Sequence, residues 1–83
     1  MYSLAGNEYI KQIVEANTQS MFRAAYSLLG DKADAEDAVQ EAFLRLVEKD
    51  PVFRDDEHEK AWLLRVTINI SKNMLIRIVL QLP

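Results

Sequence analysis

Apolar residues recur at helical spacing through the first third of the chain. They lie three, four or seven residues apart, the pattern of one face of a helix: Ile10, Val14, Met21, Ala25, Leu28 and Leu29. Gly30 follows directly, and a glycine in the left-handed conformation is a common C-terminal cap. The pattern predicts a first helix that ends at Gly30.

A second helix is predicted over residues 34–49. Asp34 is a candidate N-cap, and Asp37 three residues later resembles a capping box in which Asp replaces Glu. Asp50-Pro51 should end the helix, because the residue before a proline avoids helical dihedral angles. At about 100° per residue, one half of this helix forms an expected core stripe, made of Ala35, Ala38, Val39, Ala42, Phe43, Leu46 and Val47.

A third helix is predicted from near His58 to at least Leu75, after a charged connection over 52–59 that holds one exposed-looking aromatic residue, Phe53. Its expected core face comprises Leu63, Val66, Thr67, Ile70 and Met74, with a second apolar strip at Leu64, Ile68 and Leu75. Nothing in the chain has the pattern of a strand. The expected fold is therefore all-α, a small domain of three to four helices.

Composition limits the remaining possibilities. The 83 residues make one small domain, 1–83, near the size at which a single core is only marginally stable. Without cysteine there is no disulfide, thiolate nucleophile or cysteine zinc site. The N-terminus lacks the features of a secretory signal, and the apolar run at 74–82 is too short to span a bilayer. We expect a soluble cytoplasmic domain with no membrane insertion and no cofactor.

Charge divides the chain sharply at Glu59. Residues 1–59 hold all 13 acidic residues and six of the ten basic ones, a net of −7, whereas 60–83 hold four basic residues and no acid, a net of +4. The two blocks sum to the overall −3. A basic helix joined to an acidic body indicates two partners of opposite charge.

The half of the second helix opposite its core stripe combines acids, an amide and one apolar side chain: Asp37, Gln40, Glu41, Leu44 and Glu48. One interpretation is a solvated face with a single surface leucine, which is common. The other is a docking surface on which Leu44 is an anchor surrounded by polar groups for a basic partner helix.

One strip of the third helix gathers an aromatic residue, two cations and two amides: Trp62, Arg65, Asn69, Lys72 and Asn73. Cations neutralise phosphates, amides hydrogen-bond base edges, and an aromatic ring stacks on an unpaired base. Alternatively, the tryptophan belongs to the core and the basic residues are only solvated. The absence of any acid from this strip favours nucleic-acid binding.

These segments resemble a known family. Residues 34–47, Phe53-Arg54 and residues 61–73 look like region 2 of bacterial sigma-70-type factors, most closely the extracytoplasmic-function group. Two motifs occur in the order and separation of that family: Asp-Ala-Val-Gln-Glu at 37–41 and Trp-Leu-Leu-Arg-Val-x-x-Asn at 62–69. The resemblance covers roughly residues 8–75.

The resemblance implies two binding surfaces. The second helix would dock on the clamp helices of the largest RNA polymerase subunit, where Asp37, Gln40, Glu41 and Leu44 match contact positions of the family, with Glu48 beside them. The third helix and the preceding loop would recognise the promoter −10 element as melted non-template strand. The matching positions are Phe53, Val66 and Asn69 around a flipped base, and Trp62, Arg65 and Lys72 near the duplex edge and backbone, with Asn73 on the same strip.

The chain also departs from that family. Residues 76–83 lose the amphipathic order, placing Arg77 on the core face if the helix continues, and the family's second DNA-binding domain is absent. We therefore expect an excised domain or a truncated gene product. The alternative function is a helical interaction module, such as a target of an anti-sigma factor, without DNA activity of its own. An enzymatic role has little support, because His58 is the sole histidine and no motif places a nucleophile; with its acidic neighbours it is also under-liganded for zinc.

Overall fold

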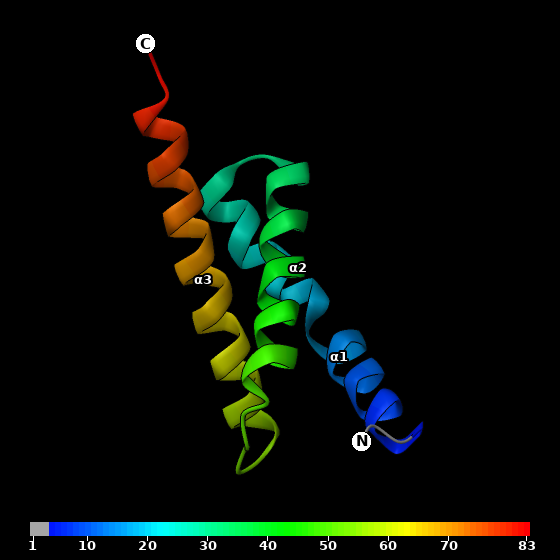
Figure 1. The fold of residues 1–83 in the computed structure, drawn as a ribbon. Coiled ribbons are helices and arrows are strands. Elements are labelled where there is room, and N and C mark those ends of the chain that lie inside the picture. Colours follow the sequence, from blue (N-terminus) through cyan, green and yellow to red (C-terminus); the bar gives the residue numbers. More distant parts are fainter. Residues whose placement is uncertain (1–3) are drawn as a thin grey trace.

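The computed structural model describes residues 4–83, which form three helices joined by two short connections (Figure 1). They are α1 (Leu4–Leu29), α2 (Lys32–Lys49) and α3 (Asp56–Leu80). Each helix packs against both of the others. The prediction of a small all-α domain is confirmed, with three helices.

A two-residue turn connects α1 to α2. Gly30 has a φ of +66°, and its N–H donates to the Tyr26 carbonyl oxygen at 2.8 Å, which caps α1 as predicted. Asp31 is the N-cap of α2, and its carboxylate accepts a hydrogen bond from the Asp34 N–H at 2.9 Å. The prediction of Asp34 as N-cap is therefore wrong. Asp34 lies in the first turn of the helix, where its negative charge still favours the helix dipole.

Replacing Gly30 tests the strain at this turn. No neighbouring atom lies within 4 Å of the position that a Cβ would take, so Gly30→Ala meets no steric obstacle beyond its own backbone. We expect a loss of about 1 kcal/mol, because an L-residue disfavours this conformation, and a Tm lower by about 4–8 °C. Asp50→Gly, at a second position with positive φ, is the control and should leave the Tm within about 2 °C. An unchanged Tm for Gly30→Ala would show that the turn adopts another conformation.

The second connection is shorter than predicted. Asp50 takes a left-handed conformation with φ of 46° after Lys49, so α2 ends at the predicted residue. The Asp55 carboxylate accepts from the His58 N–H at 2.8 Å, and the His58 imidazole accepts from the Arg54 N–H at 3.1 Å. These two bonds start α3 at Asp56, two residues before His58. The imidazole thus takes part in fixing the start of the helix.

The core contains small side chains that allow the helices to approach closely. Ala25, Ala35, Ala38 and Ala42 are fully buried, together with Met21 and Leu63. Three buried polar residues bond to carbonyl groups of their own helices: Asn17 to Ile13, Thr67 to Leu63 and Ser71 to Thr67. Among the described residues no buried polar side-chain atom lacks a partner, so these residues avoid the cost of an unsatisfied group.

Two residues differ from their expected environment. Val47, predicted in the core stripe of α2, is 52% exposed, because it lies about 100° around the helix from the buried Leu46. Phe53, predicted to be exposed, is partly buried and packs against the core. Of the predicted core face of α3, Leu63, Thr67 and Ile70 are buried, whereas Val66 and Met74 are half-buried.

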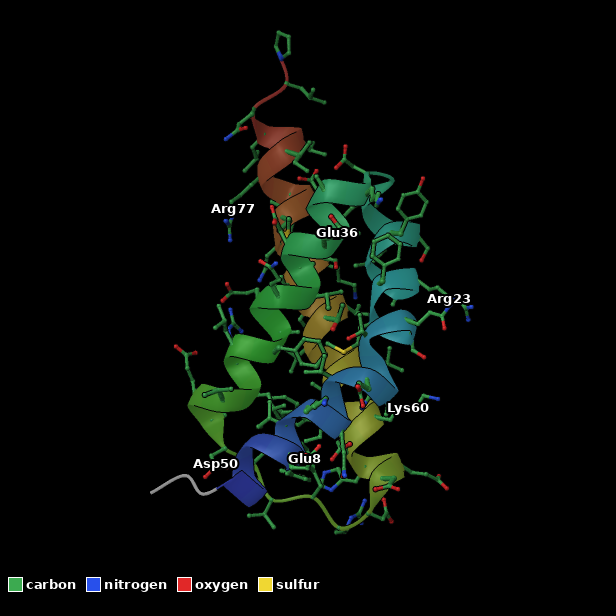
Figure 2. The ribbon with its side chains drawn as sticks, turned by 90° about the vertical axis from the view of Figure 1, so that its right-hand side faces the viewer. Glu8, Arg23, Glu36, Asp50, Lys60 and Arg77 are labelled. Carbon is green, nitrogen blue, oxygen red and sulfur yellow. The ribbon has the colours of Figure 1, made fainter. Side chains whose placement is uncertain are left out.

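The C-terminal end of α3 extends beyond the other two helices (Figure 1), which contributes to the elongated dimensions of 49 × 23 × 19 Å. Ile76, Val79 and Leu80 are exposed there. Arg77 is also exposed, because the core no longer covers the face on which the sequence placed it; Figure 2 shows it near the free end of α3, far from Lys60 and Asp50. Within residues 4–83 no helix is long and apolar enough to cross a membrane.

Candidate functional site

The predicted docking residues share the outward face of α2. Asp37, Gln40, Glu41, Leu44 and Glu48, referred to below as the α2 face, are all exposed. Leu44 is 58% exposed, and it lies on the side of the helix away from the buried Ala35, Ala38 and Ala42. The helical projection thus placed these residues correctly on one exposed surface. An apolar side chain among carboxylates is suited to a partner that combines an apolar contact with positive charge.

Arg45, which was not among the predicted docking residues, adds a cation to the edge of this surface. Its Nε lies 3.6 Å from a carboxylate oxygen of Glu41, one helical turn away, and both side chains are nearly half exposed. An exposed pair of this kind contributes little to stability. The Glu41 carboxylate can therefore exchange Arg45 for a cation of a partner at small cost.

The predicted nucleic-acid strip lies along α3. Arg65, Asn69, Lys72 and Asn73 are exposed, while Trp62 is half-buried; these five residues are called the α3 strip. All the acids of α3 lie in its first turn, at Asp56, Glu57 and Glu59, where they favour the helix dipole. From Lys60 to the end of the helix every charged side chain is basic.

Aromatic rings join the second connection to the start of this strip. The Phe53 ring lies 5.7 Å from the Trp62 ring at an interplanar angle of 65°, and 5.3 Å from the His58 ring at 87°. These edge-to-face arrangements are favourable for aromatic pairs. They hold Phe53 against Trp62, so an extended loop is anchored beside the helix that carries Asn69.

Asn73 also borders a groove between α2 and α3. The groove has a volume of about 390 Å³ and is lined by Asp37, Glu41, Arg45, Ile70, Asn73, Met74 and Arg77. It therefore connects the α2 face with the distal end of the α3 strip. The helical projection placed Asn73 only with the strip, because its position beside Asp37 and Glu41 depends on how the two helices pack.

Comparison with known proteins identifies this arrangement. The sequence matches the Sigma-70 region 2 family over residues 13–77, most of the chain. The chain belongs to the sigma-70 region 2 family. This is a non-enzymatic sigma-factor domain, and its helical fold agrees with the structure.

Two curated relatives support the assignment of region 2. The chain is 33% identical over 66 residues to the ECF RNA polymerase sigma factor SigE of Mycolicibacterium smegmatis, covering 80% of this chain and 25% of that protein. It is 43% identical over 61 residues to the ECF RNA polymerase sigma factor SigJ of Mycobacterium tuberculosis, covering 74% of this chain and 19% of that protein. The chain thus spans about a quarter or less of the length of these relatives. No solved structure matched it.

Proposed function

We propose that this region 2 domain binds core RNA polymerase through the α2 face and recognises the promoter −10 element, as melted non-template strand, through the α3 strip. The family assignment supports a role in transcription initiation. The observation that carries the proposal is the separation of charge between two exposed helical surfaces, one acidic with a leucine and the other without any acid.

The polymerase contact is assigned to α2 because this helix presents an exposed, preformed face, and the family resemblance implies that it docks on the clamp helices of the largest subunit. Leu44 supplies the apolar anchor, and Asp37, Gln40, Glu41 and Glu48 supply the surrounding polar groups. Apolar anchors near the centre of an interface commonly dominate affinity, while charges at its rim mainly raise the association rate.

The DNA contact is proposed for α3 because each part of its surface suits a different feature of a melted strand. Arg65 and Lys72 are exposed cations for the backbone. The exposed Asn69 carboxamide can both donate to and accept from a base edge. Phe53 and the half-buried Val66 would supply apolar walls for one flipped base.

The loss of a base-specific contact and the loss of a backbone contact should change DNA binding in different ways. Asn69→Ala should reduce discrimination at a single −10 position by roughly 1–3 kcal/mol, the contribution of a good base contact. Lys72→Ala should weaken binding to all sequences alike and reduce the salt dependence. Both side chains are exposed, so neither change should alter the fold.

The experiment is a competition among bubble templates that differ at one −10 position, each bound by core polymerase together with this chain. Gln81→Ala is the control for the loss of an amide, because Gln81 is exposed at the C-cap of α3 and lies outside both proposed surfaces. Equal losses on every template for Asn69→Ala would assign it to the backbone and refute the base pocket. If the chain and core polymerase together bind the bubble no better than core alone, the proposed function is refuted.

A further inference from the structure

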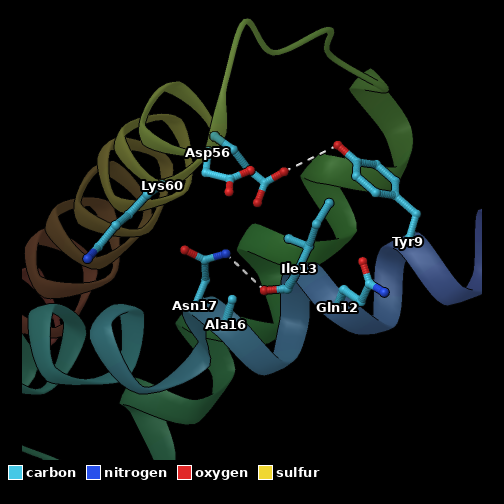
Figure 3. A pocket seen from close by; sticks show the side chains of 8 residues that line it. Tyr9, Gln12, Ile13, Ala16, Asn17, Asp56 and Lys60 are labelled. Carbon is cyan, nitrogen blue, oxygen red and sulfur yellow. Dashed lines mark hydrogen bonds between the residues drawn. The ribbon is translucent and has the colours of Figure 1, made fainter.

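A pocket between α1 and α3 lies outside both proposed surfaces. It has a volume of about 270 Å³ and is lined by Tyr9, Gln12, Ile13, Ala16, Asn17, Asp56, Glu59 and Lys60. None of these residues belongs to the α2 face or to the α3 strip. Figure 3 shows Asp56 and the Asn17 carboxamide on two sides of the same space, one on α3 and the other on α1.

The wall formed by α3 is acidic. Asp56 and Glu59 lie one helical turn apart, and the Tyr9 hydroxyl donates to Glu59 Oε2 at 3.2 Å (Figure 3). Partial burial, followed by the negative charge of Glu59 and the hydrogen bond to it, raises the pKa of the Tyr9 hydroxyl. Tyr9 therefore remains a neutral donor that holds Glu59, and its side chain, which lines the pocket, is half exposed.

Asn17 places a further acceptor at the base of the pocket. Its side chain is only 4% exposed, and its Nδ2 donates to the Ile13 carbonyl oxygen at 2.9 Å. No donor among the described residues reaches its Oδ1, yet the described part of the chain contains no fully buried polar atom without a partner. The Oδ1 atom therefore retains some exposed surface, and Asn17 is one of the residues that line the pocket. A buried amide that offers only its oxygen to a cavity is suited to a ligand that donates hydrogen bonds.

These groups match the chemistry of a guanidinium group. Asp56, Glu59 and the Asn17 oxygen are acceptors, whereas guanidinium has five donors in one plane, no acceptor, and a flat face that stacks on aromatic rings. Lys60 at the rim offsets one of the two negative charges and leaves the pocket net negative. The described residues include no group of three acids or histidines that could hold a metal ion, so an organic cation fits better.

We propose that this pocket binds an arginine side chain presented by a partner protein. Its volume of about 270 Å³ lies below the range of about 300–1,000 Å³ typical of small-molecule sites, which favours a single inserted side chain. The buried Ile13 forms an apolar floor for the methylene groups of that side chain. This contact is independent of the proposed binding of polymerase and DNA, since it uses different residues.

The test uses the complete 83-residue chain and Nα-acetyl-arginine amide as the probe, followed by NMR of the Asn17 side-chain amide and the Tyr9 ring. We expect saturable shifts at both groups. Nα-acetyl-citrulline amide, which has nearly the same shape without the charge, should produce none. Glu59→Gln and Asp56→Asn should each weaken binding by about fivefold. The matched control is Glu57→Gln, an exposed acid of the same helical turn outside the pocket, which should leave the affinity unchanged.

Several results would overturn the proposal. One is the absence of saturable shifts, and another is equal binding of the citrulline analogue. A third is the same loss of probe affinity in Glu57→Gln as in Glu59→Gln, which would indicate general attraction to the acidic first turn of α3. Tighter binding of putrescine than of the arginine probe would assign the pocket to a free amine. Tyr9→Phe keeps the ring and frees Glu59 from its hydrogen bond, so it should bind the probe at least as tightly as the unmodified chain.

Discussion

Trp62→Ala should lower the free energy of unfolding by about 2–4 kcal/mol, somewhat less than the loss of a fully buried tryptophan. The ring is half-buried, packs on the core and meets the Phe53 ring at 5.7 Å, so its removal leaves both the core and the second connection without support. For a domain of this size the Tm should fall by roughly 10–20 °C. Thermal denaturation followed by helical circular dichroism measures the change.

Trp62→Phe separates packing from the specific role of the indole. The smaller ring retains most of the contact with Phe53, so we expect it to recover more than half of the lost stability. If the exposed part of the indole contacts the duplex edge, the phenylalanine variant should open promoter DNA less well than the original chain when combined with polymerase, despite its recovered stability. A Tm of Trp62→Ala within about 2 °C of the original would place the ring outside the core and contradict the structure.

The order and type of the helices could be predicted because their signals are local. Gly30 and Pro51 each end a long periodic segment, and neither has a competing interpretation. The N-cap of α2 could not be predicted in the same way, since Asp31 and Asp34 have the same side chain. Asp37, three residues after Asp34, favoured Asp34 because it gave that residue the form of a capping box. The structure selects Asp31 because α1 ends at Leu29 and leaves a connection of only two residues.

Environments that depend on neighbouring helices were predicted less well. The exposed α2 face follows from the geometry of one helix, and the projection placed all five of its residues on the surface. Phe53 was misplaced because its burial depends on which side chains of other elements cover it. Val47 was misplaced because it lies at the margin of the predicted stripe, about 100° around α2 from the buried Leu46. The α1–α3 pocket required the same information: Asn17 and Glu59 are 42 positions apart in sequence and meet only through helix packing.

Leu44→Asp should reduce binding of core polymerase by about 2–4 kcal/mol, or roughly 30-fold or more, if the α2 face docks as proposed. The substitution removes the apolar anchor and adds a carboxylate to a surface already rich in acids. Leu44 is 58% exposed, so the free energy of unfolding should change by no more than about 0.5 kcal/mol. The measurement is an affinity titration of core polymerase with the labelled chain, accompanied by thermal denaturation.

Val79→Asp is the matched control, because Val79 is 55% exposed, on the free end of α3 and outside both proposed surfaces. It makes the same change from an apolar to an acidic side chain and should leave the affinity unchanged. Glu41→Lys should chiefly slow association, since it reverses a charge at the rim, and its effect should diminish at high salt. Undiminished binding by both Leu44→Asp and Glu41→Lys would exclude the α2 face as the polymerase contact. A loss with Val79→Asp equal to that with Leu44→Asp would show that added negative charge, rather than the lost leucine anchor, weakens the complex.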